Sequence, residues 1–75
     1  MTSMWEARAA DGRIDDLVAY VEAHADPSAD IYRADAPDPR VVVIDPTGHG
    51  IPDVPSDLVS RPPHVWDFER VRRNR

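Results

Sequence analysis

Apolar and charged residues alternate near the start of the chain. In the run WEARA at residues 5–9, every second side chain is apolar. A period of two is typical of a strand with one buried face, because successive side chains of a strand point to opposite sides. The pattern predicts a strand at about residues 3–10, ended by the turn residues Asp11 and Gly12.

The next segment changes to a helical period. Its apolar residues recur at the i, i+3, i+4, i+7 spacing that gives a helix one apolar stripe, and they are Ile14, Leu17, Val18, Val21 and Ala25. We expect Asp11 to be the N-cap, because its carboxylate can accept the unpaired N–H groups of the first turn. Pro27 should end the helix at about Ala25, since the residue before a proline avoids the helical conformation.

Two strands that are close enough to form a hairpin follow the helix. Residues 28–34, centred on Ile31 and Tyr32, predict the second strand, and residues 35–39 are a loop rich in turn residues. Residues 40–45 (RVVVID) hold four consecutive β-branched side chains. Such a run is typical of a strand buried on both faces, so we expect the third strand in the middle of the sheet.

The last third of the chain is irregular before it becomes extended again. Residues 46–63 are rich in proline and leave room only for a short helix near residues 56–59. Residues 64–71 then alternate between apolar and polar side chains, with Trp66 and Phe68 on one face. This alternation predicts a fourth strand.

The order of these elements defines the expected fold. It is an α+β, ferredoxin-like β-α-β-β-(short α)-β pattern with a four-stranded antiparallel sheet, one long helix and the first and third strands in the centre. We expect a single domain at residues 1–71, followed by a flexible arginine-rich tail at residues 72–75. One helix cannot cover all of such a sheet, so we expect a second copy to cover the rest as a face-to-face homodimer.

Composition and charge argue against certain classes of site and partner. The 75 residues include no cysteine, which excludes disulfides and thiolate metal sites. Residues 1–69 carry fourteen acids and five arginines, a net charge of -9, whereas residues 70–75 carry four arginines, a net charge of +4. Because the acidic body repels phosphate backbones, nucleic acid is not an expected partner.

The sequence also argues against a membrane location. No apolar run approaches the roughly 20 residues that cross a bilayer. The first residues lack the basic and apolar segments of a signal peptide. We therefore expect a cytoplasmic protein.

The first two thirds of the chain carry a further signal. It consists of Gly12 after the first strand, the helix residues Leu17, Val18 and Val21, the pair Tyr32-Arg33 and the run at residues 41–44. Over roughly residues 4–45 this arrangement resembles antibiotic-biosynthesis-monooxygenase-type domains of the dimeric α+β barrel superfamily, and also short actinobacterial proteins of unknown function. The resemblance implies a ferredoxin-like fold and a face-to-face dimer. The last third departs from the family, which has a full second helix there.

The loop after the third strand is the main candidate for chemistry. It reads DPTGHG at residues 45–50, where Asp45 could orient His49 as a general base and the glycines let backbone N–H groups approach a ligand. A tight turn with positive-φ glycines explains the same residues. His64 is the other candidate proton acceptor. No two histidines share a spacing typical of a metal site, so we expect neither a metal nor a cofactor.

Four aromatic side chains are candidates for binding a flat organic molecule, namely Trp5, Tyr32, Trp66 and Phe68. Since the first and fourth strands are neighbours in a ferredoxin-like sheet, Trp5 and Trp66 could lie close together and line such a pocket. In so small a domain, the same residues also suit a role as anchors of the core or of a dimer interface.

The sequence leaves three functions open. No set of acid, base and nucleophile converges, which favours a homodimeric accessory module that binds a small molecule or another protein. The resemblance and the aromatic set suggest the alternative of a cofactor-independent monooxygenase or isomerase acting on an aromatic or polyketide-like substrate, with His49 or His64 as the proton acceptor. A third hypothesis is a stress or interaction protein that uses the arginine-rich tail.

Overall fold

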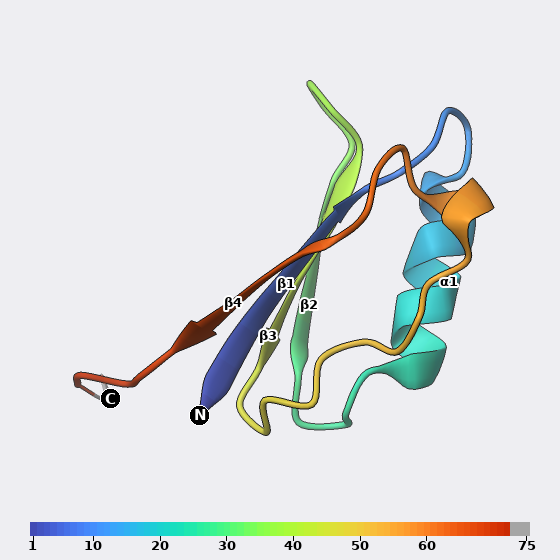
Figure 1. The fold of residues 1–75 in the computed structure, drawn as a ribbon. Helices are drawn as coiled ribbons and strands as arrows, with labels where there is room; N and C mark the ends of the chain where they lie inside the picture. The colour runs from blue at the N-terminus through green and yellow to red at the C-terminus, as the bar shows by residue number, and fades with distance from the viewer. Residues whose placement is uncertain (73–75) are drawn as a thin grey trace.

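The computed structural model describes residues 1–72, which form one long helix packed on one face of a four-stranded sheet (Figure 1). In chain order the elements are β1 (Thr2–Arg8), α1 (Ile14–His24), β2 (Asp30–Ala34), β3 (Arg40–Asp45), the 3₁₀ helix η1 (Ser56–Leu58) and β4 (His64–Phe68). The α+β class is therefore confirmed. The predicted tail at residues 72–75 lies outside the described residues except for Arg72.

The sheet has the strand order β2-β3-β1-β4, and every strand runs antiparallel to its neighbours. β1 and β3 occupy the two central positions, as the sequence pattern predicts. Trp5 of β1 lies between Val43 of β3 and Val65 of β4. This arrangement is compatible with a ferredoxin-like fold.

The hydrophobic core lies between α1 and the two central strands. The apolar stripe of α1 buries Leu17 and Val21 completely. Trp5 of β1 and the fully buried Val41 and Val43 of β3 face this stripe. The buried cluster is completed by Ala7, Ala9 and, from η1, Leu58. The i, i+4 spacing along the helix and the i, i+2 spacing along the strands thus build a single core.

The start of α1 differs from the prediction. Arg13 occupies the N-cap position and no side chain caps the first turn, so the assignment of Asp11 as the cap is wrong. The reason is that Gly12 adopts a left-handed φ of 72° and turns the chain before the helix begins. Arg13 instead pairs with two carboxylates, those of Asp16 at 2.8 Å and Asp57 at 3.3 Å.

Two strand predictions also need correction. β3 is buried on one face only, since Val41 and Val43 are fully buried while Val42 and Ile44 remain partly exposed. Its run of β-branched residues reflects a central position in the sheet, but α1 covers just one side of it. β4 ends at Phe68 and does not extend to residue 71.

Candidate functional site

The face of the sheet opposite α1, called the open face below, is the candidate functional surface. It is formed by alternate side chains of the four strands: Met4, Glu6, Arg8, Tyr32, Arg40, Val42, Ile44, His64, Trp66 and Phe68. No element within residues 1–72 covers this face (Figure 1). Three of its aromatic residues stay exposed, Tyr32 at 59%, Trp66 at 42% and Phe68 at 49%. Tyr32 lies on one edge strand of the sheet and Trp66 and Phe68 lie on the other. Exposed apolar side chains across one face are typical of an interaction surface.

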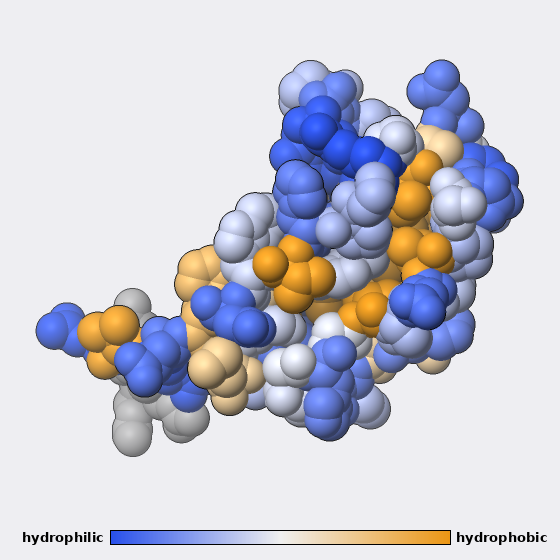
Figure 2. Space-filling view, in the orientation of Figure 1, coloured by the Kyte–Doolittle hydropathy of each residue, from blue (hydrophilic) through white to orange (hydrophobic). Residues whose placement is uncertain are grey.

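β4 is the most exposed part of the sheet. All five of its residues are exposed, and it pairs with β1 on one side only. Even its helix-side residue Val65 is 56% exposed, because α1 packs mainly on β3 and η1. There Val65 lines an open depression with Ile51, Val54 and Pro63, and Figure 2 shows apolar surface along this side of the molecule. β4 therefore presents apolar side chains on both faces and a free edge.

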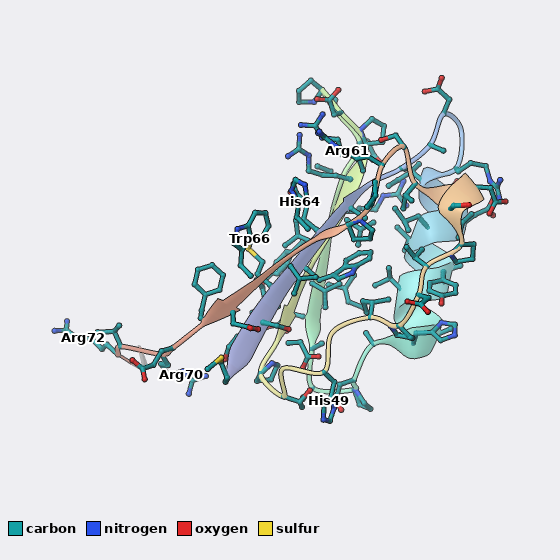
Figure 3. The ribbon with its side chains drawn as sticks, in the orientation of Figure 1. His49, Arg61, His64, Trp66, Arg70 and Arg72 are labelled. Atoms are coloured by element: carbon teal, nitrogen blue, oxygen red, sulfur yellow. The ribbon has the colours of Figure 1, made fainter. Side chains whose placement is uncertain are left out.

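One end of the open face is basic, and we call its three residues Arg8, Arg61 and His64 the basic corner. Together with Glu6 they line a shallow depression of about 10 Å³. The His64 ring meets the Trp66 ring edge-on, with the centroids 5.5 Å apart and the planes at 86°. Figure 3 shows Arg61, His64 and Trp66 in succession along β4 and the segment that leads into it.

The charges around the basic corner are only partly paired. The Arg40 guanidinium donates to the Glu6 carboxylate at 2.9 Å, and both side chains are partly buried. Arg8 approaches a carboxylate only at 3.9 Å, that of Asp38. Arg61 has no ion-pair partner among residues 1–72. The basic corner therefore keeps positive charge next to the aromatic side chains of the open face.

The loop at residues 45–50 is organised around a buried carboxylate. Asp45 is 1% exposed. Its Oδ1 accepts hydrogen bonds from the Thr47 backbone N–H at 2.8 Å and the Thr47 hydroxyl at 2.6 Å, and its Oδ2 accepts one from the Gly50 N–H at 2.8 Å. Gly48 and Gly50 adopt positive φ angles of 77° and 70°. The carboxylate thus closes a tight turn, and it does not hold the ring of the exposed His49.

The environment of Asp45 fixes its charge state. Burial by itself would raise the pKa of this carboxyl, but the hydrogen bonds from Thr47 and Gly50, helped by the nearby His49, outweigh burial and lower the pKa below its ordinary value. Asp45 is therefore ionised at neutral pH, and its hydrogen bonds are charge-assisted. An anion held in this way is a structural clamp rather than a proton acceptor.

The catalytic candidates predicted from the sequence, Asp45, His49 and His64, do not lie together in the structure. Asp45 pairs across the sheet with Ser3 on the helix side, whereas His64 pairs with Glu6 on the open face. Figure 3 shows His49 at the opposite end of the sheet from His64. Within residues 1–72, no group of three histidine, aspartate or glutamate side chains is arranged to hold a metal ion.

The aromatic candidates divide between the two faces of the sheet. Tyr32, Trp66 and Phe68 share the open face, while Trp5 is 2% exposed in the core. Trp5 and Trp66 are on neighbouring strands, as expected, but their side chains leave the sheet on opposite sides. Sequence reasoning missed Arg8 and Arg61 as site residues. The signal for Arg61 was its place just before Pro62 and Pro63, at the entry to β4.

No protein-family model, no curated protein and no solved structure matches this chain. Among residues 1–72, none of the helices has the length and apolar character needed to cross a membrane.

Proposed function

We propose that the protein is a small homodimeric binding module with a ferredoxin-like fold. In this proposal the open faces of two copies cover each other and hold a small molecule or a segment of another protein between them. The observation that carries it is the exposure of Tyr32, Trp66 and Phe68 on a face that no element of residues 1–72 covers.

The area of the open face fits such an interface. Its three aromatic side chains, each about half exposed, and the partly exposed Met4, Val42 and Ile44 offer about 400 Å² of apolar surface. A standard interface takes about 800 Å² from each partner, of which about 56% is apolar. The open face therefore supplies nearly all the apolar area that one side of a stable dimer needs. Its charged residues Glu6, Arg8 and Arg40 supply part of the polar area.

The charge distribution favours a second copy over an unrelated partner. Residues 1–69 carry a net charge of -9 and residues 70–75 a net charge of +4. In the proposed two-fold assembly, the exposed Arg70 and Arg72 of each copy meet the acidic body of the other, so the same attraction acts twice. Both surfaces are present on one chain, which makes it complementary to itself.

Sedimentation velocity over a micromolar to submillimolar dilution series tests the dimer. We expect the wild-type protein to sediment at twice the 8.4 kDa chain mass at the higher concentrations. The double variant Trp66→Ser, Phe68→Ser should shift to the monomer while it keeps the wild-type far-UV circular dichroism. Val71→Ser is the matched control, because Val71 is 97% exposed but lies beyond β4. A wild-type protein that stays monomeric at the highest concentration would refute the proposal.

A further inference from the structure

We propose that the basic corner is the carboxylate-binding end of a ligand site, and that the ligand is a small organic acid with a flat apolar body. Arg8 and Arg61 bind the carboxylate, His64 donates a further hydrogen bond, and the body lies over Trp66. The inference rests on the proposed function, since the depression of about 10 Å³ becomes an enclosed site only when a second copy covers the open face.

The backbone brings the two arginines together. Ser60 N–H donates to the Arg8 carbonyl at 3.0 Å, so the chain that leads into β4 runs directly beside the end of β1. Regular pairing with β1 resumes only at His64, opposite Glu6. Residues 61–63 therefore bulge from the sheet, and the two prolines there cannot donate to a ladder. The bulge places Arg61 in the same depression as Arg8 and His64.

Arg8 and Arg61 have weaker ion pairs than Arg13, Arg33 and Arg40, the other arginines next to the helix or within the sheet. Arg13 and Arg33 each contact two carboxylates at distances of 3.3 Å or less. Arg40 is paired with Glu6 at 2.9 Å. By contrast, Arg8 has only the 3.9 Å approach of Asp38, and Arg61 has no ion-pair partner within residues 1–72. A guanidinium group can bind a carboxylate through two of its N–H groups. The free donors of Arg8 and Arg61 therefore suit a carboxylate ligand.

The aromatic side of the site selects the body of the ligand. His64 supports Trp66 through the edge-on contact at 5.5 Å, and Trp66 remains 42% exposed on the open face. Phe68, the next residue along this face of β4, extends the apolar surface. An exposed indole next to two guanidinium groups with no carboxylate closer than 3.9 Å among residues 1–72 favours a ligand that is flat and apolar at one end and anionic at the other.

Isothermal titration calorimetry with 2-naphthoate and 2-naphthamide tests this site, because the two probes share one ring system and differ in charge. We expect 2-naphthoate to bind the wild-type protein more tightly than 2-naphthamide. Arg61→Gln should weaken 2-naphthoate binding roughly tenfold, the loss expected for a charge-assisted hydrogen bond, and leave 2-naphthamide binding unchanged. Arg33→Gln is the matched control, since it removes the same charge from a residue that pairs with Val41 on the helix side of the sheet, outside the depression, and it should leave the binding of both probes unchanged.

Sedimentation of the same samples separates the two proposals. A dimeric wild-type protein that fails to bind 2-naphthoate, or binds it equally well with Arg61→Gln, refutes the carboxylate site and leaves the dimer standing. Equal losses with Arg61→Gln and Arg33→Gln would also refute the site, since they show attraction by net charge alone. A monomeric protein refutes the proposed function, and with it the enclosed site.

Discussion

Replacement of Asp45 by asparagine tests whether one buried carboxylate holds the turn at residues 45–50. Asparagine keeps the shape of the side chain and retains one oxygen acceptor. Its second polar atom is an NH₂ group, which cannot accept the hydrogen bond that the Gly50 N–H donates to Oδ2 at 2.8 Å. The variant therefore places two donors face to face at a site that is 1% exposed.

The expected cost follows from these contacts. Loss of the charge-assisted bond to Gly50 leaves a partly buried N–H unpaired, which costs about 2 kcal/mol. The two bonds from Thr47 weaken when their acceptor becomes neutral. We expect a total loss of about 2–3 kcal/mol. A domain of this size has a free energy of unfolding of roughly 4–11 kcal/mol. Asp45→Asn should therefore remove a large share of the stability.

The effect should depend on pH in a defined direction. Because the pKa of Asp45 is lower in the folded protein, its contribution is fully present above the unfolded pKa of about 3.9 and is lost as the pH falls through the folded value. The difference in unfolding free energy between the wild type and Asp45→Asn should thus be largest near neutral pH. It should shrink progressively as the pH falls below about 4.

Urea unfolding followed by far-UV circular dichroism measures this difference, with both proteins at one concentration so that any association contributes equally. With a slope of about 1 kcal/mol per M, the midpoint should fall by about 2–3 M. The control is Asp11→Asn, because Asp11 is exposed and makes no side-chain contact among the described hydrogen bonds and ion pairs. If the urea midpoint of Asp45→Asn equals that of the wild type within experimental error at neutral pH, the carboxylate does not hold the turn.

Two further predictions concern glycines and helix capping. Gly48→Ala should destabilise the fold by at least about 1 kcal/mol more than Gly12→Ala, as measured by thermal unfolding. Both glycines have a positive φ, but only at position 48 would the new Cβ meet a backbone atom, the Met1 carbonyl oxygen at 2.7 Å. Asp11→Ala should change the free energy of unfolding by less than about 0.5 kcal/mol, because Asp11 does not cap the helix. Replacing a true N-cap residue by alanine costs about 1 kcal/mol, so a loss of that size in urea unfolding would show that Asp11 is the cap.

The elements of this fold could be predicted because their patterns are local. The alternation at residues 5–9 and the spacing of Leu17 and Val21 each reflect one buried face, and the structure buries those faces. The capping assignment failed because it depends on the backbone angle of Gly12, which composition does not encode. The prediction that β3 is buried on both faces was wrong because a run of β-branched residues indicates a central strand, but it does not indicate whether one face of the sheet or both are covered.

The site was harder to predict because it depends on register. Tyr32, Trp66 and Phe68 share a face only because of the pairing of β2, β3, β1 and β4, and that pairing also sends Trp5 to the opposite side. Arg61 joins Arg8 through an irregular segment that has no periodic signature. Asp45 and His49 are near in sequence, but the turn directs the carboxylate to backbone and hydroxyl donors instead.

Fluorescence of Trp66 during dilution tests most directly whether a second chain covers the open face. In the variant Trp5→Phe, which replaces the buried indole by a smaller aromatic side chain, Trp66 is the sole tryptophan. We predict a blue-shifted emission at high concentration that moves to the red on dilution, with the midpoint of the dimer dissociation measured by sedimentation. A Trp66 emission that is red-shifted and unchanged at every concentration would contradict the account.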